Sequence, residues 1–148
     1  MSGSRLLLWS SLVTLVLGCG TEPDDKTVYG TYALVAVEGS PVPYLDPTDP
    51  DCDVYITQGE LRLLFTGTYD LQFSGPYQCT GGQNGTLGRL YSGPFTTTGS
   101  TLAFTAEIQG FGPLQFSGTA GLGTVEVTVP PIPPTTGPDL TLGFQINP

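Results

Sequence analysis

Apolar and polar residues alternate along most of the chain after residue 28, and this pattern restricts the fold more than any other feature. Alternating segments cover residues 69–73, 101–108, 114–117, 124–129 and 140–146. A period of two places successive side chains on opposite faces of an extended strand. No segment after residue 28 has the 3.6-residue period of an amphipathic helix. The pattern therefore predicts an all-β fold of antiparallel strands with one dry and one wet face.

Four further segments read as extended, which gives eight or nine strands in total. They are residues 28–37, 53–57, 60–66 and 89–96. Turn residues separate the strands at positions 58–59, 66–67, 99–100, 110–113 and 121–123. Such close spacing predicts sequential hairpins, that is, a meander. Two longer interruptions are expected: a flexible glycine-rich loop at 80–88 and a stiff polyproline segment at 130–138.

A meander of this length must bury one face and protect its edge strands. Closure into an up-and-down barrel does both, and a two-sheet β-sandwich is the alternative. A barrel of about eight strands is just wide enough to be filled by side chains or to hold one small ligand. The sequence leaves the filled and the hollow barrel open.

The N-terminal residues read as an export signal. Arg5 precedes an uncharged stretch at 6–17, which is too short to span a bilayer but suits the core of a signal peptide. The stretch ends in Val16-Leu17-Gly18-Cys19, which resembles the bacterial lipobox. The resemblance implies a signal peptide at 1–18, cleavage before Cys19 and acylation of Cys19. Residues 20–27 are polar and have no apolar period, so 19–27 are expected to be a lipidated tether and 28–148 the barrel domain. Gly20, in place of Asp, implies an outer-membrane location by the same resemblance.

Cysteine usage agrees with an exported protein. With Cys19 carrying lipid, Cys52 and Cys79 remain as a pair. An exported chain folds in a compartment that permits disulfides. We therefore expect a Cys52–Cys79 disulfide, with two free buried thiols as the alternative.

Residues 30–43, G-T-Y-A-L-V-A-V-E-G-S-P-V-P, carry a resemblance to a family. They are similar to the opening of a group of small bacterial lipoproteins described as lipocalin-like. In that group a first strand of the form G-x-[YW]-x-L precedes a short turn and a G-x-P-[LV]-P segment. The resemblance implies a lipocalin-like barrel and supplies no activity.

Composition argues against catalysis and against nucleic acid as a partner. The chain contains no His, so it cannot form a Ser-His-Asp or Cys-His arrangement. Glu38, Glu60, Glu107 and Glu126 could in principle supply a carboxylate pair, but the last two alternate onto wet faces. The net charge of −9 disfavours nucleic acid. We expect no enzyme and no cofactor.

An acidic cluster is the candidate metal site. Asp46, Asp49, Asp51 and Asp53 lie within eight residues that also contain two prolines. Calcium takes six to eight oxygen ligands, which acidic loops supply, although the spacing is not that of an EF-hand. A solvated acidic loop is the simpler interpretation, and calcium stays a weaker hypothesis.

Aromatic residues on the expected dry face are candidate ligand contacts. They are Tyr32, Phe65, Tyr69, Phe73, Phe104, Phe116 and Phe144. In a hollow barrel they would line an apolar pocket, and in a filled barrel they would be core. The sequence thus predicts a lipid-anchored, non-catalytic barrel of the cell envelope with an accessory or structural role toward another envelope protein. The alternative is a carrier of a small apolar ligand inside the barrel.

Overall fold

A computed structural model describes residues 28–132 and 136–147 of the chain. The expected signal peptide at 1–18 and the lipidated tether at 19–27 lie outside these residues. No helix of the described part is long and apolar enough to cross a membrane.

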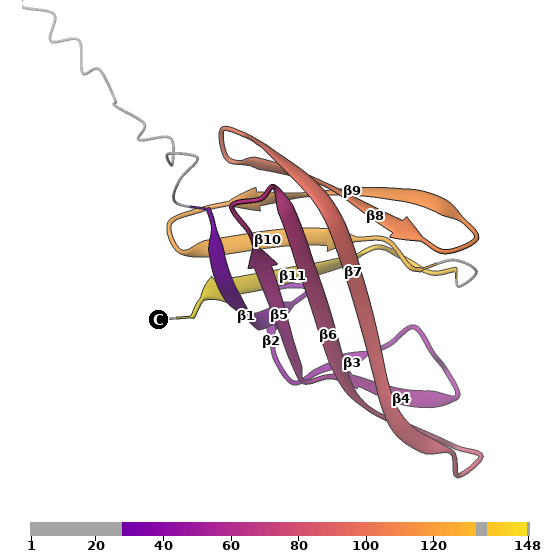
Figure 1. The fold of residues 1–148 in the computed structure, drawn as a ribbon. Helices are drawn as coiled ribbons and strands as arrows, with labels where there is room; N and C mark the ends of the chain where they lie inside the picture. The colour runs from indigo at the N-terminus through magenta and orange to yellow at the C-terminus, as the bar shows by residue number, and fades with distance from the viewer. Residues whose placement is uncertain (1–27, 133–135, 148) are drawn as a thin grey trace, which may run out of the picture.

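The described part of the chain forms eleven strands and no helix (Figure 1). In chain order they are β1 (Gly30–Val37), β2 (Ser40–Pro41), β3 (Tyr44–Asp46), β4 (Cys52–Ile56), β5 (Gln58–Leu63), β6 (Thr68–Cys79), β7 (Asn84–Thr98), β8 (Thr101–Ile108), β9 (Gly112–Ala120), β10 (Thr124–Val129) and β11 (Leu140–Ile146). All strand pairs are antiparallel, as the alternation predicts.

Eight of these strands close into an up-and-down, lipocalin-like barrel. The strands β5 to β11 pair in sequence order, and β1 closes the circle because it pairs with both β5 and β11. In β1, Tyr32 lies opposite Leu61 on one side and Ile146 on the other. A β-sandwich has two separate sheets, so this closure excludes the alternative.

The inward face of each strand carries the apolar set that the alternation predicts. Leu71, Phe73, Leu102, Phe104 and Val127, for example, are all at most 5 % exposed. In β1 the alternation shifts at a β-bulge between Leu34 and Ala36, which brings Val37 into the core three residues after Leu34. Apart from tyrosines, no polar or charged side chain of the described residues is buried.

The two ends of the barrel differ. We name one after Val28 and the other after the arm that extends from it. At the Val28 end, the described chain begins and the turns 64–67, 99–100 and 121–123 join the strands. Val28 itself is 2 % exposed and packs into the core, and its carbonyl accepts a hydrogen bond from the Tyr32 hydroxyl at 2.8 Å. The opposite end holds residues 38–39, 109–111, 130–132 and 136–139, and we name it the arm end.

An arm extends from the arm end of the barrel (Figure 1). It consists of β3, β4 and the distal parts of β6 and β7, residues 75–79 and 84–88. The strands β4 and β5 both pair with β6 and are separated only by Thr57, whose backbone N donates to the Ser74 carbonyl at 3.0 Å. Gly75 lies at this bend, and a Cβ there would overlap the Tyr55 carbonyl oxygen.

Three expectations about the connections were wrong. The glycine-rich segment 80–88 is not one long loop, because Asn84 to Gly88 pair with β6 and only the turn around 80–83 remains. Positions 58–59 belong to β5 and do not form a turn between strands. Residues 112–113 belong to β9. Of the expected polyproline segment at 130–138, residues 130–132 and 136–138 are irregular and the rest lies outside the described residues.

Candidate functional site

The seven aromatic candidates do not all face the barrel interior. Tyr32, Tyr69, Phe73, Phe104 and Phe144 are buried and Phe116 is half-buried, whereas Phe65 is 83 % exposed. The prediction for Phe65 was wrong because β5 ends at Leu63, two residues before it. The Gly67 backbone N donates to the Leu64 carbonyl at 3.0 Å, and this turn directs Phe65 away from the core.

The inward aromatic rings pack on one another around Phe104. Its ring centroid lies 4.8 Å from that of Tyr69, 5.1 Å from that of Phe116 and 6.0 Å from that of Phe95. Tyr91 joins this cluster through Phe116 at 5.6 Å. Offset and edge-to-face contacts at these distances are the favourable arrangements of packed rings. The aromatic candidates other than Phe65 therefore act as core, filling the interior that a hollow barrel would leave to a ligand.

Tyr91 and Phe95 are core aromatics that the sequence interpretation missed. Both lie on β7 and are buried, at 1 % and 6 % exposure. They stand four residues apart, which is compatible with a period of two, so the alternation itself could have identified them. Gly93 and Pro94 between them concealed the pattern, because both residues usually interrupt strands.

The hollow at the arm end of the barrel is small. It is lined by Asp46, Ile56, Phe73, Leu87, Arg89 and Leu140, among others, and its volume is about 20 Å³. A drug-sized ligand occupies pockets of about 300–1,000 Å³. A wider hollow of about 500 Å³ lies over Gln58, Glu60 and Gln72, and it opens on the outer wall of β5, β6 and β7.

Three buried tyrosine hydroxyls differ in their partners. The Tyr32 hydroxyl donates to the Val28 carbonyl and the Tyr91 hydroxyl donates to the Pro130 carbonyl, both at 2.8 Å. The Tyr69 hydroxyl has no hydrogen-bond partner among the described residues. Burial raises the pKa of all three phenols, and for Tyr69 the neighbouring Tyr91 and Asp70 raise the pKa further. These groups stay protonated at neutral pH, so none can act there as a general base.

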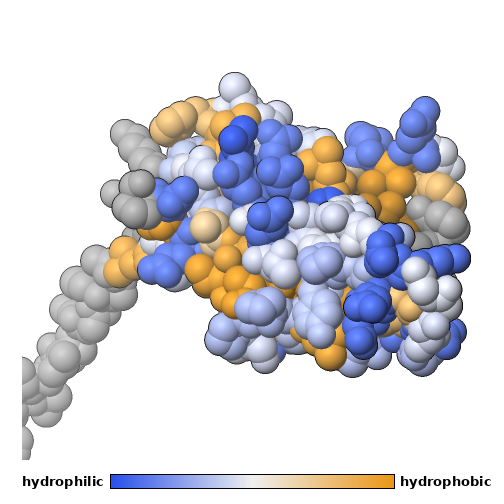
Figure 2. Space-filling model, turned by 90° about the horizontal axis from the view of Figure 1, so that it is seen from below, coloured by the Kyte–Doolittle hydropathy of each residue, from blue (hydrophilic) through white to orange (hydrophobic). Residues whose placement is uncertain are grey.

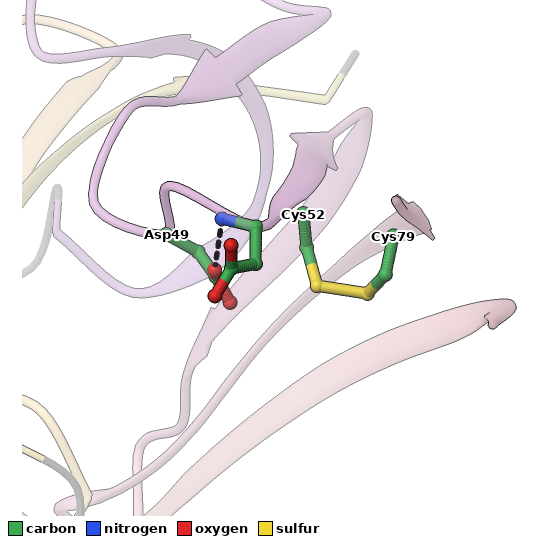
Figure 3. Close-up of a disulfide and its surroundings, with 4 residues drawn as sticks. Asp49, Cys52 and Cys79 are labelled. Carbon is green, nitrogen blue, oxygen red and sulfur yellow. Dashed lines mark hydrogen bonds between the residues drawn. A yellow bond between two sulfur atoms is a disulfide. The ribbon is translucent and has the colours of Figure 1, made fainter. Parts of the chain in front are cut away.

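The predicted disulfide between Cys52 and Cys79 is present. It joins the first residue of β4 to the last residue of β6, which are also cross-strand partners with Cα atoms 3.9 Å apart (Figure 3). Both cysteines are half-buried. The bridge therefore fastens the outermost part of the arm, where few side chains are removed from water.

The acidic cluster lies on the arm, next to the disulfide (Figure 3). Two of its four carboxylates accept hydrogen bonds within the loop: Asp46 accepts from the Thr48 backbone N and Asp49 accepts from the Asp51 backbone N, each at 3.0 Å. Such contacts are Asx-turns, which shape loops of this composition. Among the described residues, no three His, Cys, Asp or Glu side chains are grouped so that they could hold a metal ion. The calcium hypothesis for Asp46, Asp49, Asp51 and Asp53 rests on the sequence alone.

The glutamates are placed on the outside of the barrel. Glu107 and Glu126 are exposed, on the wet faces that the alternation predicts for them. Glu60 forms an ion pair with Arg62 at 2.6 Å between Oε1 and Nε. Glu38 lies in the turn after β1, where its carboxylate accepts from the Thr141 backbone N. These contacts give Glu60 and Glu38 local structural roles.

Comparison with known proteins gives this chain no relatives from which a function could be transferred. No family model, no curated protein and no solved structure matches it. Cys19, the candidate lipidation site, lies outside the described residues. The function is therefore inferred from the residues of this chain.

Proposed function

We propose that this chain is a lipid-anchored lipoprotein of the cell envelope whose barrel has no catalytic role and serves as an accessory or structural protein. One observation carries the preference for this role over ligand transport: the aromatic cluster around Phe104 fills the barrel interior. A barrel filled by its own side chains offers its outer surface for contacts. The lipobox-like sequence at 16–19 supports the anchor, and Gly20 favours the outer membrane as its location.

The arm is the surface that we propose for contact with another envelope protein. Leu45 and Tyr55 are cross-strand partners on β3 and β4 and are 45 % and 37 % exposed. Asp53 lies two residues before Tyr55, so it projects from the same face. An exposed apolar pair beside a carboxylate suits a partner that presents an apolar contact next to basic side chains.

The anchor is tested by fractionating cells that express the full chain. We expect the protein in the membrane fraction and an N-terminal peptide that begins at Cys19 and carries acyl chains by mass spectrometry. A Cys19→Ser variant should leave the membrane fraction. An unmodified Cys19 thiol on the processed wild-type chain would contradict the lipoprotein assignment.

The partner is tested by photo-crosslinking in intact cells. A photoreactive residue replaces Leu45 on the arm or, as the matched control, the exposed Thr96 on the outer wall. We expect one discrete cross-linked protein from position 45 and none from position 96. Equal labelling from both positions, or none from position 45, would count against an accessory role of the arm.

Native mass spectrometry of the detergent-solubilised protein examines the alternative of a bound apolar ligand. We expect the mass of the acylated polypeptide alone, with the disulfide intact. An added mass that is lost on denaturation would overturn the preference for a filled barrel.

A further inference from the structure

The Val28 end of the barrel carries exposed apolar side chains on two turns and on the last strand. Phe65 in the turn after β5 is 83 % exposed and Leu122 in the turn after β9 is 91 % exposed. Leu64 and Ile146 are 42 % and 43 % exposed. Single exposed apolar residues are ordinary on protein surfaces, whereas several on one face indicate a contact surface.

Contacts within the molecule connect these side chains into one surface. The Phe65 ring lies 4.7 Å from the Tyr29 ring, and Tyr29 directly precedes Gly30. A Cβ on Gly30 would lie 3.6 Å from Ile146, so this side chain covers the glycine. The Ile146 backbone N donates to the Gly123 carbonyl at 2.8 Å, and Gly123 follows Leu122. We name this surface, from Phe65 through Ile146 to Leu122, the apolar end.

Charge is distributed unequally between the two ends. The turns 64–67, 99–100 and 121–123 of the Val28 end contain no charged residue. The opposite end and the arm hold Glu38, Glu107, Asp139 and the acidic cluster 46–53. An uncharged apolar surface enters the interface of a bilayer without the cost of desolvating charges, while the acidic end stays in water. Figure 2 shows apolar surface beside the point where the described chain begins.

The path of the chain identifies a bilayer as the occupant of this surface. The described chain begins at Val28, directly before Tyr29, whose ring contacts Phe65 of the apolar end, and Cys19 precedes Val28 by nine residues. Nine residues span at most about 30 Å when fully extended. An acylated Cys19 would therefore keep the apolar end within about 30 Å of the membrane that holds it.

We propose that the apolar end docks on the surface of the lipid bilayer, with Phe65 and Leu122 inserted at its interface. This inference rests on the proposed lipid anchor at Cys19. Docking fixes the orientation of the molecule: the barrel stands on the membrane and the acidic arm points away from it. The arm is thereby presented to partners at a distance from the lipid.

Tryptophan fluorescence tests the docking because Trp9 is the only Trp of the chain and lies in the predicted signal peptide. Single variants Phe65→Trp, Leu122→Trp and Phe111→Trp are expressed as the full chain, purified with the anchor and reconstituted into phosphatidylcholine vesicles with brominated acyl chains. Phe111 is the matched control position, since it is 57 % exposed in the turn after β8 at the arm end. We expect bromine to quench the Phe65→Trp and Leu122→Trp variants at least threefold more strongly than the Phe111→Trp variant.

Flotation of the same vesicles separates failure of the anchor from failure of the docking. Flotation of the protein without preferential quenching at positions 65 and 122 overturns the docking and leaves the anchor intact. If the emission at these positions is shifted to the blue but is not quenched, a second copy of the protein buries the apolar end. This result also overturns the docking. Protein that lacks acyl chains and does not float overturns the anchor and the docking together.

Discussion

The barrel body and the arm are built from continuous strands, yet they are stabilised in different ways. In the barrel body, β6 alternates between fully buried residues such as Leu71 and exposed ones such as Asp70 and Gln72. In the arm, beyond Gly75, the same strand has only half-buried and exposed residues. The strand pairing with β7 continues without a register shift from Thr68 to Gln78.

The difference teaches that strand pairing and core formation are separable along one hairpin. Backbone hydrogen bonds carry β6 and β7 into the arm, but a sheet without a closed interior cannot remove its side chains from water. Hydrophobic burial stabilises the body, whereas a covalent bridge between Cys52 and Cys79 stabilises the end of the arm. The two regions should therefore respond to different substitutions.

The largest effect is expected from removing the central ring of the body. Phe104→Ala should lower the free energy of unfolding by about 4 kcal/mol, because truncation of a fully buried phenylalanine loses its burial and leaves a cavity. Denaturant unfolding measures this loss. The control is Phe65→Ala, where an exposed ring is removed and the change should stay below about 1 kcal/mol. Equal losses would mean that Phe104 is not the centre of the core.

Removing the disulfide should act on the arm. The double variant Cys52→Ala/Cys79→Ala should lose about 3.5 kcal/mol, the value that chain entropy gives for a closed loop of this length. Hydrogen exchange localises the effect: amides of β4 and of residues 75–79 should lose protection well before those of β8 and β10. Uniform loss of protection across the barrel would show that body and arm unfold as one unit.

The junction between the barrel body and the arm requires a residue without a side chain at position 75. Gly75→Ala should cost about 3 kcal/mol, because its Cβ would overlap the Tyr55 carbonyl oxygen and β4 would have to move. Gly81→Ala is the matched control in the turn at the tip of the arm, where nothing lies within 4 Å of the added Cβ. A stable Gly75→Ala variant would mean that β4 can leave β6 without affecting the barrel.

The sequence predicted the body better than the arm, for the same physical reason. A strand that buries one face carries a period of two, and this period predicted segments such as 101–108 and 124–129. Beyond Gly75 the arm has no fully buried face, so the alternation there is only between half-buried and exposed residues and is weaker. Asn84 to Gly88 pair with β6 through backbone groups, which glycine supplies as well as any residue, and the segment was interpreted as a loop.

The candidate site could be predicted where a rule based on the local sequence was enough. It could not be predicted where the burial of a side chain depended on the residue at which a strand ends. The Cys52–Cys79 disulfide followed from counting cysteines once Cys19 was assigned to lipid. Phe65 continued the alternation of Leu61 and Leu63, and only the turn at 64–67 moves it to the surface. The bulge in β1 and the bend at Gly75 depend on contacts between strands distant in sequence, which local periodicity does not record.

The smallest expected effect concerns one oxygen atom within the body. Tyr69→Phe should raise the free energy of unfolding by about 1 kcal/mol, because the buried Tyr69 hydroxyl has no partner among the described residues and its desolvation is uncompensated. Tyr32→Phe is the control of opposite sign: it removes a hydroxyl that donates to Val28, and should cost about 1 kcal/mol. Destabilisation by Tyr69→Phe would show that the hydroxyl is hydrogen-bonded.

Alkaline unfolding examines the same hydroxyl independently. Burial raises the pKa of Tyr69 above the ordinary value of 10.0 that the unfolded chain has. Above that pH the unfolded state releases a proton that the native state retains, so the stability of the native protein falls as the pH rises. Unfolding of the wild type between pH 9 and pH 11 should therefore depend more steeply on pH than unfolding of Tyr69→Phe, and the difference should grow toward about one proton near pH 11. Equal slopes would mean that Tyr69 titrates in the folded barrel as it does in the unfolded chain, and the interior around Phe104 would then be accessible to water.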